Sequence, residues 1–323
     1  ESAPERGPAR TYTTLRSPAG PSRGLVCCAA AATAAGTGAA TAAAPAAPGL
    51  ETWPWKTAQG MLVSPLDERE YRWLVLPNGL KVLLIHDAKA NKAAAAMAIG
   101  VGAASDPPHL PGLAHFLEHM LFLGSSTFPQ ENAYKAYLSR HGGSSNAWTS
   151  MDNTLFKLQV GADHLKGALD IFSQFFVCPL FSEGSTEREL RAVDSEDSKN
   201  RTNDDRRMLQ VLKALASPDH RYAKFSTGNL QTLREDVPKG VDTREELLRF
   251  HQRHYHAPNM ALAVVGREGL DALEEWAREC FQDVRQADAE SEANQGGAAS
   301  AASATSALTQ ALALHQWKGS GGR

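Results

Sequence analysis

The sequence contains little of several features that would point to a particular class of protein. It has only four cysteines in 323 residues, and two of them, Cys27 and Cys28, are adjacent. This set is not a disulfide framework and fits a reducing compartment. We expect the two isolated cysteines, Cys178 and Cys280, to be small buried residues. The formal net charge is only −3, which gives no electrostatic reason to expect nucleic acid or an anionic membrane as a partner.

Long apolar runs are also missing, since no stretch approaches the roughly 18–20 residues that span a bilayer. Both ends of the chain lack the residues of a core. Residues 1–52 are mostly Ala, Pro, Gly, Thr, Ser and Arg, with four arginines and no acidic residue between Arg6 and Leu50. Residues 287–323 are rich in Ala, Ser and Gly. These compositions predict a disordered leader and a low-complexity tail or linker.

The leader allows two interpretations. Arginines and frequent Ser and Thr without acids are typical of organelle transit peptides, and the same segment can be a featureless extension. The chain begins at Glu1 rather than at Met, which indicates processing or a fragment. The location that follows is the cytoplasm or the interior of a chloroplast or mitochondrion.

Residues 53–286 carry the patterns of a folded domain. Two β-type runs flank Asn78-Gly79 within 71–87 and predict a hairpin. In 154–160, Phe156, Leu158 and Val160 alternate with polar residues, as in a half-buried strand. Further strands are expected at 93–102 and 259–266, and helices within 112–125, 131–140, 165–178, 185–201, 205–215, 243–255 and 270–281. This order predicts an α+β fold, with helices covering a mostly antiparallel sheet.

The stretch "GLAHFLEHMLFLGS" (112–125) holds polar residues in an otherwise apolar helix. His115, Glu118 and His119 stand at i, i+3 and i+4 and therefore share one face of the helix. Ionisable groups are costly in a core unless they are paired or bind a metal. Two imidazoles four residues apart can bind one zinc ion, and a carboxylate between them can accept a proton from water, as in the H-x-x-E-H motif. The alternative is a pair of hydrogen-bonded core histidines.

A catalytic zinc site of this type takes a third protein ligand. The acidic helix "ERELRAVDSEDSKN" (187–200) is the best source, because a His₂Glu set is common in zinc enzymes. Taken alone, such a helix is more often a solvated charged face. The spacing does not choose among four acidic residues, which are Glu187, Glu189, Asp194 and Glu196.

Four stretches together resemble one protein family. They are "GLAHFLEHMLFLGS", "ENAYKAYLSRHGGSSNAWTS", "FFVCPLF" and "ERELRAVDSEDSKN", and they occur in the order found in the insulin-degrading branch of the pitrilysin/insulinase zinc peptidases. The resemblance extends from about Tyr71 to about Val284. It implies a zinc-dependent endopeptidase domain that acts on peptides and holds one zinc ion.

The resemblance also implies roles for individual residues. It makes Glu196 the third zinc ligand beside His115 and His119, and Glu118 the general base. Glu189 matches an acid that supports the metal site from behind the ligands. Asn146 and Ala147 match edge-strand positions that hold the substrate backbone, which an extended peptide can do through main-chain hydrogen bonds. The residues alone favour a polar turn entering a strand at "SSNAWTS".

The chain departs from the family in its extent. Members of this branch have four homologous domains in two halves, and this sequence contains only the first. We therefore expect an intact zinc site with weak or no proteolysis from this chain alone. A truncated gene model, a splice form, or a short protein that works with a separate C-terminal-half partner or as a homo-oligomer would each explain the length. The alternative function is a non-catalytic peptide-binding or scaffold member of the same fold.

Overall fold

The structure is a computed structural model that describes residues 56–58 and 61–287 of the 323-residue chain. The predictions of a disordered leader, a transit peptide and a low-complexity tail fall outside these residues, apart from Ala287 at the start of the tail. Within the part that the structure describes, no helix is both long and apolar enough to cross a membrane.

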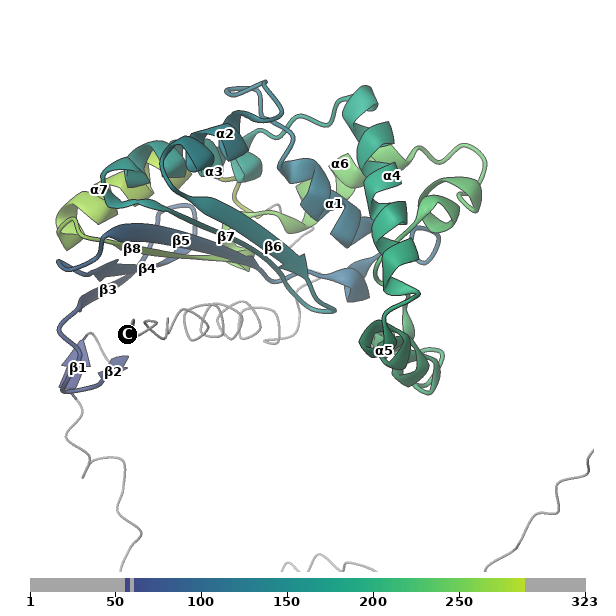
Figure 1. The fold of residues 1–323 in the computed structure, drawn as a ribbon, viewed down its shortest axis with the longest axis horizontal. Coiled ribbons are helices and arrows are strands. Elements are labelled where there is room, and N and C mark those ends of the chain that lie inside the picture. The colour runs from purple at the N-terminus through teal and green to yellow at the C-terminus, as the bar shows by residue number, and fades with distance from the viewer. Residues whose placement is uncertain (1–55, 59–60, 288–323) are drawn as a thin grey trace, which may run out of the picture. The chain divides into compact units, whose positions relative to one another are not determined.

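A six-stranded sheet forms the base of the fold, in the order β3-β4-β8-β5-β7-β6 (Figure 1). Only the β4–β8 pair is parallel, and the other four pairs are antiparallel. A separate two-stranded sheet pairs β1 with β2. The strands are β1 (Lys56–Ala58), β2 (Met61–Val63), β3 (Glu70–Val75), β4 (Lys81–His86), β5 (Lys92–Ile99), β6 (Ser144–Thr149), β7 (Thr154–Gly161) and β8 (Met260–Gly266).

Helices pack against one face of the six-stranded sheet (Figure 1). The α-helices are α1 (Leu113–Leu121), α2 (Ala133–Arg140), α3 (Leu165–Val177), α4 (Glu183–Asn200), α5 (Asp204–Ala214), α6 (Thr243–His254) and α7 (Leu270–Phe281). A π-helix at Gln231–Glu235 and four short 3₁₀ turns at Ala103–Ser105, Ala162–His164, Arg221–Ala223 and Ala257–Asn259 complete the described elements. The predicted α+β class is therefore confirmed.

The sequence patterns located most of these elements because their periods are strong. The hairpin is β3–β4, and each predicted helix occurs within a few residues of its expected bounds. The strand β6 is the main difference from the interpretation based on the residues alone. "SSNAWT" forms the edge strand of the sheet rather than a turn, because it pairs with β7 along its whole length, from Ser144 opposite Gln159 to Thr149 opposite Thr154.

The hydrophobic core lies between the sheet and the helices. Alternate residues of the strands point into it, among them Met97 and Phe156, which are fully buried. From the helices, Phe175 and Phe176 of α3 meet Phe156, with ring centroids 5.7 Å apart for the Phe156–Phe176 pair. The helix α1 is buried on almost all sides, which explains its nearly continuous apolar sequence.

The start of α1 is held by a close backbone contact. Gly112 precedes the helix with φ +95°, a left-handed conformation that only glycine adopts at little cost. A Cβ atom added there would lie 2.2 Å from the Cα atom of Gly228. Gly112 thus lets the loop before the π-helix approach α1. The close contact requires that neither Gly112 nor Gly228 carries a side chain.

We predict that Gly112→Ala lowers the free energy of unfolding by about 2–5 kcal/mol, because left-handed strain and overpacking add. Gly184→Ala is the matched control. Gly184 lies in the first turn of α4 and a Cβ atom there would meet only a side-chain nitrogen of Arg188 at 3.6 Å. Urea unfolding should show little change or a gain of up to about 1 kcal/mol for this control. Equal stability of the two variants would contradict the close-contact explanation.

Candidate metal centre

The three polar residues of α1 point toward one cavity. It has a volume of about 630 Å³ and opens between α1, α4 and the edge strand β6. His115, Glu118 and His119 line it from α1, and Asn146, Ala147, Trp148 and Thr149 line it from β6. The structure therefore brings the residues proposed for the metal and those proposed for the substrate backbone to the same opening.

Each imidazole of α1 is oriented by a partner from another segment. Nδ1 of His115 lies 2.6 Å from the backbone oxygen of Thr227. Because a carbonyl oxygen can only accept, Nδ1 carries the proton and the lone pair is on Nε2. His119 is held in the same way, with Nδ1 3.2 Å from Oε2 of Glu189. Both Nε2 atoms are thereby turned toward a common point.

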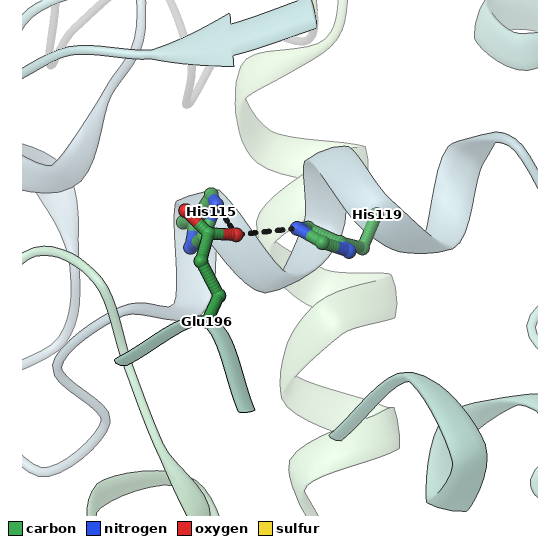
Figure 2. A group of neighbouring side chains, drawn as sticks. All are labelled: His115, His119 and Glu196. Carbon is green, nitrogen blue, oxygen red and sulfur yellow. Dashed lines mark ion pairs between the residues drawn. The ribbon is translucent and has the colours of Figure 1, made fainter. Parts of the chain in front are cut away.

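Glu196 of α4 completes the cluster. Its Oε2 atom lies 3.6 Å from Nε2 of His115 and 3.6 Å from Nε2 of His119 (Figure 2). One donor atom from each of these residues falls within 4.8 Å of the others. Donors around a tetrahedral ion with bonds of about 2.0–2.1 Å stand about 3.3 Å apart. Two imidazole nitrogens and a carboxylate oxygen at this spacing fit a divalent metal ion.

The tertiary structure separates the four acids that the spacing left open. Glu187 pairs with Arg234 at 2.6 Å, and Asp194 accepts the N–H of Leu230 at 3.0 Å. Glu189 stands behind His119, and only Glu196 faces both imidazoles. Glu189 and Glu196 reach α1 together because residues seven apart share one face of α4.

The charges of the cluster shift the pKa values of its members. Burial alone would lower the pKa of His119, but the hydrogen bond with Glu189 and the ion pair with Glu196 outweigh it and raise that pKa to about 9. The neighbouring imidazole of His119 lowers the pKa of Glu196 to about 2, against its partial burial. Without a metal, a proton on His119 thus provides the positive charge between two carboxylates.

Glu118 is the most buried of these ionisable groups, with 7% of its surface exposed. Burial raises its pKa, while His115 and the hydroxyl of Thr149 act in the opposite direction. The Thr149 hydroxyl donates to Oε2 of Glu118 at 2.6 Å. This contact joins α1 to the edge strand β6, and it fixes the carboxylate of Glu118 beside the two histidines.

Several residues of the site had no signal in the sequence. Thr149 and Thr227 are common polar residues, and their partners in α1 lie 31 and 112 positions away in the chain. Asp106 lies in the loop before α1 and is a third such residue. It accepts the N–H groups of Gly112 at 2.7 Å and Ala114 at 2.8 Å and so caps α1 from a distance. The one sequence signal for this cap is an acidic residue seven positions before the first residue of α1, Leu113.

Known protein families and individual proteins resemble this chain over most of its described residues. The family model "Insulinase (Peptidase family M16)" matches residues 81–219, and the model "Peptidase M16 inactive domain" matches residues 243–306. The A-factor-processing enzyme of Saccharomyces cerevisiae is 54% identical over 221 residues, which are 68% of this chain and 21% of that protein. The insulin-degrading enzyme of Homo sapiens is 51% identical over 223 residues, 68% of this chain and 22% of that protein.

A solved structure gives the same result. The crystal structure of pitrilysin matches with a TM-score of 0.68 and 37% sequence identity, over 72% of this chain and 25% of that chain. The fold matches that of pitrilysin, and α1 carries the inverted H-x-x-E-H pattern within a His–His–Glu cluster that could hold a metal ion. The chain belongs to the insulinase family, peptidase family M16, as the resemblance implied. It spans about a fifth of the length of the curated relatives that it matches.

The cap at Asp106 generates a prediction about the helix that carries the site. Asp106 is buried, which raises the pKa of its carboxyl to about 7 although the hydrogen bonds from Ala114 and Gly112 lower it. Asp106→Ala leaves two buried amides unpaired and should cost about 2–4 kcal/mol of unfolding free energy. Asp163→Ala removes an exposed partner of Arg267 and should cost at most about 1 kcal/mol. Urea unfolding compares the two, and equal losses would contradict the cap.

Proposed function

We propose that this chain is the zinc-binding catalytic domain of a metalloendopeptidase that hydrolyses peptides. The observation that carries the proposal is the convergence of two imidazole nitrogens and one carboxylate oxygen beside Glu118, in a cavity bordered by an edge strand. The relatives named insulin-degrading enzyme and "Putative zinc protease mug138" support the choice of zinc and of peptide substrates.

In this proposal His115, His119 and Glu196 hold the metal, and Glu189 orients His119. Glu189 does so by accepting a hydrogen bond from the Nδ1–H group, which keeps the Nε2 lone pair directed at the metal position. A zinc ion held there supplies Lewis-acid chemistry, because it polarises a carbonyl group and lowers the pKa of water toward about 7.

Glu118 is the proton carrier of the chain itself. A buried carboxylate with a raised pKa can accept a proton from the attacking water and then pass it to the leaving amine. The hydroxyl of Thr149 holds one carboxylate oxygen at 2.6 Å. The second oxygen is the one that we propose takes the proton.

The edge strand β6 would bind the substrate backbone. It is the last strand of the sheet, paired only with β7 among the described strands, so that its outer side can accept another strand. Asn146 and Ala147 lie in the part of β6 that borders the cavity. A peptide added there would run past Glu118 and the metal ligands, and backbone pairing would favour extended substrates over folded ones.

We further propose that efficient cleavage needs polypeptide beyond this domain, supplied by a C-terminal-half partner or by a second copy. The support is the chain's share of about a fifth of its relatives' length. The compartment stays a prediction. One plant relative is named "Insulin-degrading enzyme-like 1, peroxisomal", which describes that protein.

The proposed zinc site predicts the metal content of the purified protein. Elemental analysis of the purified, folded chain should find about one zinc ion per molecule. His119→Ala and Glu196→Gln each remove a ligand and should lose or strongly weaken it. Glu189→Gln should still bind zinc, with an affinity about 10–100-fold lower in a chelator competition, because it acts through His119. A folded chain that takes up no zinc when the metal is offered would support the non-catalytic scaffold instead.

A variant of Glu118 separates catalysis from metal binding. Glu118→Gln should retain zinc but lose peptide cleavage by at least about 100-fold, the usual contribution of a general base. The assay measures cleavage of a quenched fluorescent peptide by the chain alone and by the chain mixed with the C-terminal half of a relative. Activity that appears only in the mixture would support the need for further polypeptide. Equal cleavage by the wild type and Glu118→Gln would refute the role of Glu118.

A further inference from the structure

The cavity around the metal cluster contains two cationic side chains that the proposed chemistry does not use. They are Lys135 of α2 and Arg206 of α5. The three acids of the same lining, Glu118, Glu189 and Glu196, are engaged inside the site by a threonine hydroxyl, by one imidazole and by both imidazoles, respectively. A peptide that enters the cavity therefore meets acids that already have partners, and positive charges that can act on the peptide.

The side chain of Arg206 is the less engaged of the two cations. Its backbone N–H donates to Oδ1 of Asn203 at 3.0 Å, which caps α5 and fixes the position from which the side chain starts. Within the part of the chain that the structure describes, its guanidinium makes no hydrogen bond and no ion pair. The ammonium group of Lys135, by contrast, lies 5.7 Å from the ring centroid of Phe122. The N–H donors of the Arg206 guanidinium are thus available to a ligand.

The face of α5 that carries Arg206 is turned toward the end of β6. Arg206 and Lys213 stand seven positions apart and share one face of the helix. Nζ of Lys213 lies 3.4 Å from Sδ of Met151, two residues beyond Thr149, the last residue of β6 (Figure 1). Because Thr149 also holds the carboxylate of Glu118, Arg206 lines the cavity at the end of β6 that lies beside the proposed general base.

The charge of Arg206 also acts on the metal cluster. The pKa of Glu196 is lowered chiefly by His119, and Arg206 contributes to the same shift. A divalent ion held by the cluster would compensate the charge of Glu196 and so leave Arg206 for another anion. A guanidinium binds a carboxylate through two parallel hydrogen bonds, a geometry that an ammonium group does not match. The ligand group that fits Arg206 is therefore a carboxylate of the bound peptide.

We propose that Arg206 is a specificity-determining residue, which selects peptides with an acidic side chain at the Thr149 end of the substrate strand. An aspartate or glutamate placed there would accept hydrogen bonds from the guanidinium, whereas a lysine or arginine would meet a like charge. This inference rests on the proposed function, because it names the substrate class of the same cavity. It concerns binding, so that its test does not depend on how fast this chain cleaves.

Peptide binding to the zinc-loaded Glu118→Gln chain tests the proposal without loss of the ligand by cleavage. The probes are fluorescein-labelled neutral peptides of about nine residues, long enough to cover the six residues of β6. A single Glu is moved along the peptide, and each Glu peptide is compared with the Gln and Lys peptides of the same position. Fluorescence anisotropy gives the Kd. We expect one or two positions where the Glu peptide binds at least about fivefold more tightly than the Gln peptide, and the Lys peptide more weakly than either.

Three variants assign this preference to one side chain. Arg206→Gln should bring the Kd of the Glu peptide to within about twofold of that of the Gln peptide. Arg206→Lys keeps the charge without the planar fork and should retain part of the preference. Arg207→Gln is the matched control, because it removes the same charge from the next residue, which pairs with Asp204 at 2.9 Å and does not line the cavity. It should keep the full preference. Zinc analysis of each variant verifies that the metal cluster is intact.

Three results would overturn the inference and leave the proposed function in place. Glu and Gln peptides could bind equally at every position, which would mean that Arg206 does not contact the substrate. The preference could disappear in Arg207→Gln as well, which would assign it to the general field of α5. Arg206→Gln could weaken all peptides by the same factor, which would assign Arg206 to support of Glu196. A zinc-loaded chain that binds no peptide at all, neutral ones included, would instead refute the proposed substrate strand on β6 and the inference with it.

Discussion

The burial of ionisable groups on one apolar helix is the constraint on which the rest of the domain depends. His115, Glu118 and His119 lie on α1 inside a protein core, where an unpaired charge or polar group is expensive. The fold meets this cost with partners from three other segments. Thr227 holds His115, Glu189 holds His119, and Thr149 holds Glu118. The same contacts that make burial tolerable also orient the side chains.

These contacts explain the arrangement of the surrounding elements. The helix α4 must lie along α1 for Glu189 and Glu196 to reach the histidines, and the loop before the π-helix must approach closely for Thr227 to do so. Gly112 and Gly228 permit that approach because neither has a side chain. Asp106 fixes the first turn of α1 by accepting hydrogen bonds from the backbone N–H groups of Gly112 and Ala114. The position of the metal cluster is thus set by backbone contacts as much as by the ligands themselves.

The edge position of β6 connects the metal cluster to the proposed substrate. In an inner strand, Thr149 could still hold Glu118, but the backbone of Asn146 and Ala147 would be paired on both sides. At the edge, one side remains for a peptide. The strands β5 and β8, by contrast, lie at the centre of the sheet and are paired on both sides, so that they offer no free edge.

The sequence by itself determined the class of the fold and the centre of the site. The alternation in 154–160, the Asn78-Gly79 turn and the helical spacing around His115 are local patterns, and they predict local structure because strand and helix periods act over a few residues. The family resemblance named Glu196, which spacing alone did not. Only the tertiary structure decided which acid faces both imidazoles, and which residues hold them. Those contacts join α1 to positions 31 to 112 residues away along the chain, and no local pattern encodes which distant segments packing brings together.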